Sequence, residues 1–374
     1  MLIVQTISTM AGFDALAPEW ERLESRVSPR VPFSSPVWCK LWWTHFHRSG
    51  LACRDQLRVY AVRRPNGALV GVAPMFLTSR PGWGIVRTRE LQFFGADPYV
   101  TELRGPVCRA EDTVAVVEAL SGHVRRMREC DWVQWRGMRY ADDVAHPELR
   151  LREDDRLGVV DHFLAVPESW EAFKAGLPRN IKESLRKCYN SLKREKLDFE
   201  FRIVSAPEDV PAAIDRFLEL HKARADQADT VQHADVFDGA PARALLRDYC
   251  LTLARRDALR IFQLAVGGKV VATRIGFVLG DEIYLYFSGY DFAYGRFSVM
   301  TTTVAEAIKW SIENGFRIVN LSTGTDVSKT RWRPQQLFYH GGYEVFAAVK
   351  SRAAFRFVEA VRERGKPQYV ARTA

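Results

Sequence analysis

The stretch YLYFSGYDFAYGRFS at residues 284–298 decides the fold. It starts as a strand pattern and ends where an apolar helical pattern begins, over 299–314. Two further strand patterns, 259–266 and 270–279, precede it and are separated by short Gly-containing turns, which typically connect antiparallel strands. A strand pattern follows the helix at 317–321. This order predicts an α/β domain of the α+β kind, with a mainly antiparallel central sheet flanked by helices.

Strand and helix patterns of the same kind fill the rest of the chain. The second half adds strands at 161–166, 198–204 and 343–349, and helices at 179–196, 209–226 and 241–255. The first half has strand patterns at 2–7, 57–62, 69–76, 86–94, 101–107 and 132–135, and helical patterns at 13–26, 37–47 and 113–128. The second half thus repeats the plan of the first in coarse outline.

The length of the chain and one irregular stretch predict how it divides into domains. At 374 residues it exceeds the size at which one hydrophobic core keeps growing. Residues 139–158 are charged, contain proline and lack periodicity, which is typical of a linker. We therefore expect a first domain at 1–158, a second at 159–350, and a basic helical tail at 351–374.

Composition narrows the function classes. The net charge is +9, which favours an anionic partner, although many basic proteins simply have basic surfaces. Charged residues interrupt every apolar run, so a transmembrane helix is not expected, while peripheral contact with a membrane stays open. The N-terminus lacks the features of a signal peptide, and the six cysteines show no metal-ligand spacing. These features predict a cytoplasmic protein with reduced thiols and no metal.

The start of the helix at 299–314 is a candidate anion site. Ser298 is placed to cap it, its first turn holds threonines in place of acids, and Arg296 lies just outside. A helix start of this kind suits a phosphate group. The alternative is an ordinary capped helix whose apolar stripe packs against the sheet.

The strands before this helix carry candidate polar side chains. Strict alternation places Tyr284, Tyr286 and Ser288 on one face, opposite Ile283, Leu285 and Phe287. The tyrosine face would line a substrate cleft or form a half-exposed sheet face. On the neighbouring strand, Arg274 stands among small residues and would extend into open space toward an anion, or form a buried ion pair.

The loop at 320–334 concentrates glycine, an acid, basic residues and tryptophan, as binding loops often do. Asp326 would serve as a general base toward an incoming ammonium, and Lys329 would stabilise an oxyanion or a phosphate. A surface salt-bridge cluster is the alternative. The helix at 179–196 adds seven basic residues around an apolar stripe, and suits either an anionic partner or a solvated face.

Several of these segments, in this order, resemble the acetyltransferase family related to BioF2 and the cellulose-biosynthesis CelD proteins, which are distant relatives of the FemABX transferases. The matching segments are Arg186-Lys187, 220–224, 268–272, 284–291, 313–316 and 324–332. The first half resembles the degenerate N-terminal repeat of such proteins loosely. The resemblance implies two GNAT-like repeats, with an acyl-donor site in the second.

The resemblance also implies roles for individual residues. Acetyl-CoA or another acyl-CoA would be the donor, and an amine, such as an amino sugar of a polysaccharide or cell-envelope precursor, the acceptor. Asp326 would deprotonate the amine, with Tyr286 and Lys329 as polar support. The donor-binding candidates are Arg296, Ser298, Thr301 and Tyr290. The acceptor-binding candidates are Tyr284, Arg274, His221 and Trp332.

Two other functions stay open. FemABX-like relatives use aminoacyl-tRNA as donor, and the positive charge would suit RNA. Alternatively, the chain would be a non-catalytic GNAT-fold scaffold in a polysaccharide-synthesis complex, since Ser298-Val299-Met300 replaces the Ser-Pro-Gly usual in the family.

Overall fold

A computed structural model describes residues 1–82, 87–97, 99–140, 152–153, 157–225, 235–346 and 348–364. The first half contains β1 (Ile3–Ile7), α1 (Met10–Glu24), α2 (Pro36–Phe46), β2 (Arg54–Arg63), β3 (Leu69–Pro81), β4 (Arg87–Phe93), α3 (Thr113–Met127) and β6 (Trp132–Met138). Short elements in it are η1 (Pro32–Ser34), β5 (Val107–Cys108) and η2 (Ala110–Asp112).

The second half follows the same order, preceded by β7 (Arg152–Glu153) and three added elements, β8 (Val159–Ala165), α4 (Trp170–Gly176) and α5 (Arg179–Arg194). It then contains β9 (Phe199–Val204), α6 (Val210–Ala225), α7 (Ala240–Ala254), β10 (Leu259–Val266), β11 (Lys269–Leu279), β12 (Glu282–Tyr290), η4 (Phe292–Phe297), α8 (Val299–Glu313) and β13 (Ile318–Thr323). The chain continues through α9 (Val327–Thr330), β14 (Gln335–Val345) and α10 (Val349–Arg364).

Each half is therefore one copy of a repeat with the order βααβββαβ, from β1 to β6 and from β9 to β13. In both copies the meander is antiparallel and its last strand pairs in parallel with the strand after the helix: β4 with β6, and β12 with β13. The two copies form one open sheet in the order β1-β2-β3-β4-β6-β14-β8-β13-β12-β11-β10-β9. The predicted mixed α/β fold with tandem repeats is confirmed.

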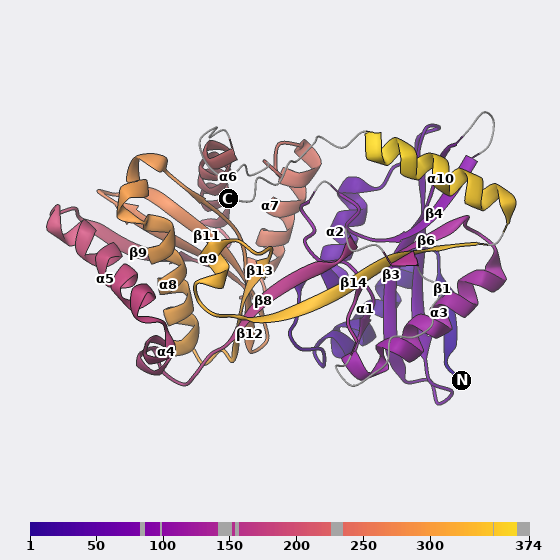
Figure 1. The fold of residues 1–374 in the computed structure, drawn as a ribbon, viewed down its shortest axis with the longest axis horizontal. Helices are drawn as coiled ribbons and strands as arrows, with labels where there is room; N and C mark the ends of the chain where they lie inside the picture. Colours follow the sequence, from indigo (N-terminus) through magenta and orange to yellow (C-terminus); the bar gives the residue numbers. More distant parts are fainter. Residues whose placement is uncertain are drawn as a thin grey trace.

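Two strands are exchanged at the centre of this sheet. β8 follows the first repeat in sequence but pairs with β13 of the second, whereas β14 follows the second repeat but pairs with β6 of the first. β8 and β14 also pair with each other, with Gln335 opposite Phe163 and Tyr339 opposite Val159. In Figure 1 the two strands run side by side from one repeat to the other. The exchange ties the repeats together through backbone hydrogen bonds.

Helices cover both faces of the sheet (Figure 1). One hydrophobic cluster contains residues of α1, α2, α6 and α7, so that it runs across both repeats. The ring of Trp38 on α2 meets that of Tyr249 on α7 edge-on, with 4.8 Å between centroids. On the opposite face α3 and α8 cover separate clusters of their own repeats. Burial of large aromatic side chains at the α2–α7 contact favours a fixed arrangement of the lobes.

Most predicted elements lie within a few residues of the observed ones, and the predicted helical tail is observed as α10. Two strand predictions are wrong. Residues 101–106 form extended chain without ladder pairing, and only Val107–Cys108 pairs, with β3. The last strand lies at Gln335–Val345 and not at 343–349, because α10 begins at Val349. Most of the expected linker lies outside the described residues, and the domain limits stay a prediction.

Candidate active site

The parallel pair β12–β13 opens partway along its length. Three residue pairs are in register, from Glu282 opposite Ile318 to Tyr284 opposite Asn320, and the pairing ends there. Both strands continue beyond this point, to Tyr290 and Thr323. The ends of β12 and β13 therefore bound a wedge, whose backbone groups need partners from elsewhere.

Arg274 of β11 occupies this wedge. Its Nη2 donates to the carbonyl of Leu285 on β12 at 2.6 Å and to that of Leu321 on β13 at 3.2 Å. Its Nε has no hydrogen-bond partner. The side chain is buried, and burial lowers the pKa of Arg274 to about 10. The expectation of open space around Arg274 is wrong, because its guanidinium links the two separated strands.

A carboxylate from the first repeat reaches the same wedge. The Oε2 of Glu102 accepts a hydrogen bond from the hydroxyl of Tyr284 at 2.7 Å, and its Oε1 accepts one from Ser322 Oγ at 2.7 Å. Burial raises the pKa of Glu102 above its ordinary value, although the Ser322 hydrogen bond and nearby Lys329 act against it. Ser322 has a φ of +76°, a conformation that is uncommon for residues other than glycine. Strained backbone of this kind concentrates at functional sites.

Asp161 on β8 is a second buried carboxylate in this cluster. Its Oδ2 accepts a hydrogen bond from Asn320 Nδ2 at 2.7 Å, while its Oδ1 has no partner. Burial raises the pKa of Asp161 to about 7, and the negative charge of Glu102 acts in the same direction. Two carboxylates with raised pKa values, from two separate segments, thus meet where the two repeats join, as is typical of active sites.

Asp326 and Lys329 lie together beside the wedge. Asp326 caps α9 by accepting from the backbone N–H of Ser328 at 3.0 Å, and Lys329 Nζ donates to its Oδ2 at 3.0 Å and to the carbonyl of Thr323. Burial alone would raise the pKa of Asp326, but Lys329 and Ser328 outweigh it and hold the pKa well below the ordinary value. A carboxylate paired in this way is a weak base.

The alternation of side chains along β12 breaks at a bulge. Arg274 pairs with Ser288 and Gly276 with Leu285, so that β12 has one residue more than β11 over this span. Phe287 therefore joins the side of Tyr286, and their rings lie 4.5 Å apart. The predicted placement of Phe287 with Ile283 and Leu285 is wrong, because a bulge shifts the following side chains to the other face.

Three predicted site residues are packed away from the wedge. Tyr286 is buried, and its hydroxyl donates to the carbonyl of Val100. His221 on α6 is buried, with Nδ1 3.2 Å from the carbonyl oxygen of Ser288. Trp332 is buried in the cluster beneath α8, near Phe173. These contacts give each side chain a packing role.

The start of α8 differs from the expected capped helix. Ser298 has a φ of +54°, and its side chain forms no cap hydrogen bond. The hydroxyl of Thr301 accepts from Arg331 Nη1 at 2.8 Å. Arg296 pairs with Glu195 at 3.0 Å, and the ring of Tyr290 lies against that of Phe292. Nothing acidic stands in the first turn of α8, as the sequence predicts.

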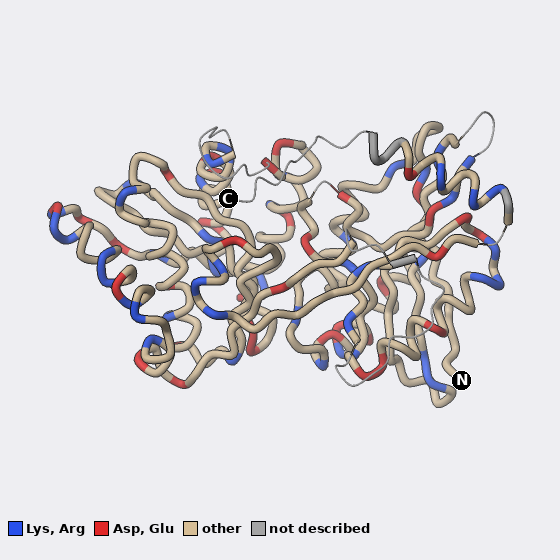
Figure 2. The backbone as a smooth tube through the Cα atoms, viewed as in Figure 1, with Lys and Arg blue, Asp and Glu red and all other residues tan. Residues whose placement is uncertain are grey.

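A basic cleft of about 610 Å³ lies between α5 and the start of α8. Its charged or hydroxyl-bearing lining includes Arg186, Lys187, Arg194, Arg296 and Ser298, against one acid, Glu183. The Lys and Arg residues of α5 are shown in blue in Figure 2. The cleft combines a helix N-terminus with convergent positive charge, which is suited to phosphate groups. The sequence predicts the basic helix and the start of 299–314 as separate anion-binding features, and the structure brings the two together in one cleft.

The equivalent opening in the first repeat is filled. There the parallel pair β4–β6 also ends after three residue pairs, but the chain before β5 runs against β6. A Cβ on Gly105 would lie 2.7 Å from the carbonyl oxygens of Arg136 and Gly137. A Cβ on Gly137 would lie 2.3 Å from the carbonyl oxygen of Arg104. Backbone therefore contacts backbone where the second repeat has its wedge.

Glu102 and Asp161 were not among the residues singled out from the sequence. Glu102 lies in a stretch predicted as a strand, and its partner Tyr284 is 182 residues away. Asp161 was the first residue of a predicted strand. An acid at the start of an otherwise apolar strand was a signal, but one that many exposed strand ends share.

Comparison with known proteins finds a family whose model matches the part of the chain that contains these features. Residues 179–332 match the family model described as an acetyltransferase (GNAT) domain. The matched part begins at α5 and ends after α9, so it includes β12, β13 and the basic cleft. This part of the chain is similar to a GNAT acetyltransferase domain. A comparison with curated proteins found no match.

Two solved structures share the fold over nearly the whole chain. FemX is 8% identical, and the match covers 96% of this chain and 100% of FemX with a TM-score of 0.57. The C-terminal DUF2156 domain of a putative lysylphosphatidylglycerol synthetase from Agrobacterium fabrum is 12% identical, with 94% and 98% covered and a TM-score of 0.50. At these identities the similarity establishes the fold alone. The fold is GNAT-like, while the BioF2-like and CelD-like assignment stays a prediction.

Two classes of site are not found in the described part of the chain. No helix there is long and apolar enough to cross a membrane. No group of three or more His, Cys, Asp or Glu side chains there is arranged to hold a metal ion.

Proposed function

We propose that the protein is an acyl-CoA-dependent N-acyltransferase that acts on an amine. The observation that carries this proposal is the wedge between β12 and β13. The basic cleft lies at the start of α8, the helix that connects these two strands. Glu102 contacts the wedge through Tyr284 of β12. We place the donor in the second repeat, within the expected domain 159–350. In the described part of the first repeat, within 1–158, backbone fills the equivalent position.

The donor would lie with its phosphates in the basic cleft and its thioester at the wedge. Lys187, Arg186 and Arg296 would contact the phosphates, and the free N–H groups at the start of α8 would add to them. The acyl-bearing arm would follow β12 toward Tyr284. Separated strand ends are suited to this because their backbone groups can pair with the amide groups of a pantetheine chain.

The reaction is a direct transfer. The acceptor nitrogen attacks the thioester carbonyl, a C–N bond forms, and the C–S bond breaks to release the coenzyme as its thiol. Glu102 takes the proton that the amine loses, directly or through a water molecule, and returns it to the departing thiolate, which leaves as the thiol. Arg274 contributes its unpaired Nε–H and its charge to the negative oxygen of the intermediate. Holding the two reactants side by side supplies a large part of the acceleration.

Two candidate bases stand close to the wedge. Asp326 was predicted for this role and remains a candidate, but its pair with Lys329 lowers its basicity. Glu102 has a raised pKa and only neutral hydrogen-bond donors, Tyr284 and Ser322. We therefore assign proton removal to Glu102, and assign to Asp326 the role of holding Lys329 near the carbonyl of Thr323.

An assay of thiol release tests the proposal. The full chain is incubated with acetyl-CoA and glucosamine, an amino sugar, and the free coenzyme thiol is measured with a chromogenic disulfide. We expect release that depends on both substrates, with an N-acetylated product identified by mass spectrometry. Release that is independent of the amine, or no release with any of a panel of amines and acyl-CoAs, would contradict the proposal.

A second candidate function is aminoacyl transfer from tRNA. It is favoured by the fold shared with FemX and by the basic side chains along α5. Binding of tRNA releases counterions and therefore weakens steeply as salt rises, whereas binding of a small acyl-CoA depends on salt less. Titration of both donors at low and high salt distinguishes the two functions.

A further inference from the structure

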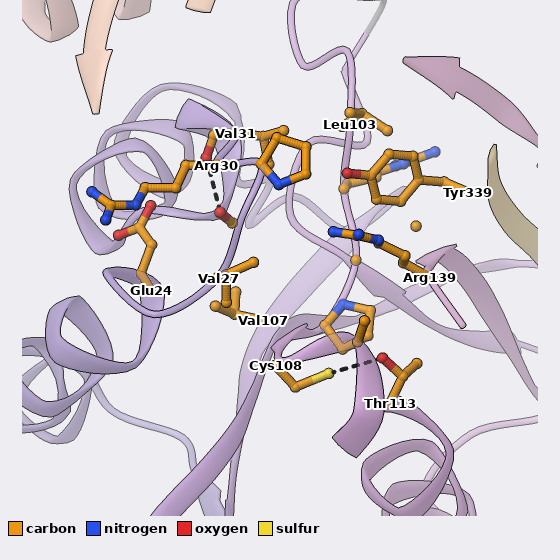
Figure 3. A pocket seen from close by; sticks show the side chains of 17 residues that line it. Glu24, Val27, Arg30, Val31, Leu103, Val107, Cys108, Thr113, Arg139 and Tyr339 are labelled. Carbon is orange, nitrogen blue, oxygen red and sulfur yellow. Dashed lines mark hydrogen bonds between the residues drawn. The ribbon is translucent and has the colours of Figure 1, made fainter. Parts of the chain in front are cut away.

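A small, partly open cavity lies on the first-repeat side of the wedge. It has a volume of about 60 Å³ and lies between the loop after α1, the chain before β5, and Tyr339 of β14 (Figure 3). Leu103, which lines it, directly follows Glu102. Glu102 itself does not line the cavity, which lies along the same chain segment as the proposed base and is lined by Arg30, Arg104 and Arg139.

Arg104 is a buried guanidinium that has no carboxylate in direct contact among the described residues. Its Nη2 donates to Gln134 Oε1 at 3.3 Å, and its Nη1 is buried with no partner. Within the described residues, no carboxylate lies within 4.0 Å of its guanidinium nitrogens. Burial lowers the pKa of Arg104 to about 9, with Arg136 acting in the same direction, so that it is still charged at pH 7. The carboxylates of Asp97 and Glu90 act on Arg104 from beyond ion-pair distance and favour its charged form, but its buried Nη1 is left without a hydrogen-bond partner, which is costly.

Arg139 is similar. Its Nη1 donates to the carbonyl of Ser28, and the described residues offer it no carboxylate partner. In Figure 3 its guanidinium points into the cavity, beside the hydroxyl of Tyr339. Arg30 is engaged with the carbonyls of Leu279 and Ser25. Two guanidinium groups with neutral partners therefore converge with a phenol on one small space.

The acid on the other side of the cavity does not neutralise them. Burial, with the nearby charge of Glu21, raises the pKa of Glu24 to about 8. Glu24 is thus mostly protonated at pH 7, and its labelled side chain lies on the side of Arg30 in Figure 3. The cavity is therefore positively charged at neutral pH.

We propose that this cavity binds one oxyanion group, a carboxylate or a phosphate, carried by the acceptor. Its role in acceptor binding rests on the proposed function, whereas the anion site itself does not. The volume is about twice the share of one water molecule, which fits a single group and not a whole substrate. Guanidinium groups bind planar carboxylates and phosphates through paired hydrogen bonds. The acceptor would be held by its anion at Arg104 and Arg139 while its amine reaches Glu102.

Binding of simple ions to the full chain tests this site. Inorganic phosphate and acetate are titrated by calorimetry at low salt into the wild type, Arg104→Gln, Arg139→Gln and Arg26→Gln. The last is a control, because Arg26 is exposed and lies in the same loop but outside the cavity. We expect saturable one-site binding of at least one ion, about tenfold weaker in the first two variants and unchanged in the control.

The two ions show whether the site prefers phosphate or carboxylate. No saturable binding of either ion, or equal weakening in Arg26→Gln, would overturn the proposal. If Arg104→Gln fails to fold, the test rests on Arg139→Gln, because Arg139 is only half-buried. Undiminished ion binding in Arg139→Gln would then overturn the proposal. Acetyl-CoA is titrated in parallel. If acetyl-CoA fails to bind, the proposed function is contradicted and the anion site is not. If the small ions fail to bind, the anion site is contradicted and the proposed function is not.

Discussion

Glu102 of the first repeat and Tyr284 of the second are joined by a 2.7 Å hydrogen bond at the opening of the β12–β13 pair. This contact brings a carboxylate from one copy of the repeat to the wedge of the other. The first copy has lost its own opening to close backbone packing at Gly105 and Gly137. The two copies thus contribute different parts to one candidate site.

Replacement of Glu102 by Gln tests its role as base. The amide keeps the shape and can accept one of the two hydrogen bonds while donating to the other hydroxyl, but it cannot take up the proton, so acyl transfer should fall by about 100- to 10,000-fold while acetyl-CoA binding is kept. Steady-state kinetics combined with a donor titration measure both quantities. Asp326→Asn is the matched comparison, and a greater loss of turnover in that variant would assign the proton transfer to Asp326 instead.

Arg274 should stabilise the separated strands. Arg274→Met removes the donor of two hydrogen bonds and leaves the carbonyls of Leu285 and Leu321 without it, at a cost of about 1–3 kcal/mol for each buried group. Arg274→Lys, which keeps a charge and donors, should lose less. Urea unfolding of the three proteins gives the free energies. Equal stability of the wild type and Arg274→Met would show that the guanidinium does not link the strands.

Asp161 should make stability depend on pH. Its pKa rises from an ordinary value near 3.8 to about 7 on folding, so the native state holds a proton that the unfolded chain loses between these values. Its contribution is complete below about pH 4 and is lost as the pH rises toward 7. We expect the free energy of unfolding to fall over this range by a few kcal/mol more in the wild type than in Asp161→Asn, on the order of the shift itself.

Unfolding by urea at a series of pH values between 4 and 8 measures this difference. Asp161→Asn keeps an acceptor for Asn320 and removes the titration, so it is the matched control. Parallel pH profiles for the two proteins would show that Asp161 is not perturbed.

The filled opening of the first repeat depends on glycine. Gly105→Ala would place a Cβ 2.7 Å from two carbonyl oxygens, so we expect a loss of stability of about 2 kcal/mol or more. Gly176→Ala is the control, because a Cβ there meets nothing within 4 Å, and it should be neutral or slightly stabilising. Thermal unfolding of both variants provides the comparison. Equal melting temperatures would mean that the segment before β5 moves away from β6 readily.

The periodic elements could be predicted from the sequence because their apolar spacing is local. The meander β10–β12, the helix α8 and the basic helix α5 all lie near their predicted limits. The exchange of β8 and β14 could not be predicted, since the strand pattern of a segment does not say which neighbour it pairs with. The bulge between Arg274 and Gly276 likewise leaves no periodic signal, and it moved Phe287 to the other face.

The candidate site was only partly predictable. The composition of the loop at 320–334 indicated Asp326 and Lys329, which the structure places together. The absence of acids from the first turn of the helix at 299–314 indicated an anion site beside Arg296, where the structure has the basic cleft. Glu102 was missed because a strand pattern does not say which distant residues its side chains will meet, and Tyr284 is 182 residues away. Tyr286 was named for its hydroxyl and His221 for the family resemblance, but aromatic side chains with a polar group also pack well in a core.

Donor binding is the most direct test of the account. Acetyl-CoA is titrated by calorimetry into the wild type, Lys187→Gln in the basic cleft, and Lys193→Gln, an exposed lysine of the same helix outside it. We predict saturable one-site binding that is weakened about three- to tenfold in Lys187→Gln and unchanged in Lys193→Gln. No binding of acetyl-CoA or of a longer acyl-CoA to the wild type would contradict the account and favour a tRNA-dependent or non-catalytic role.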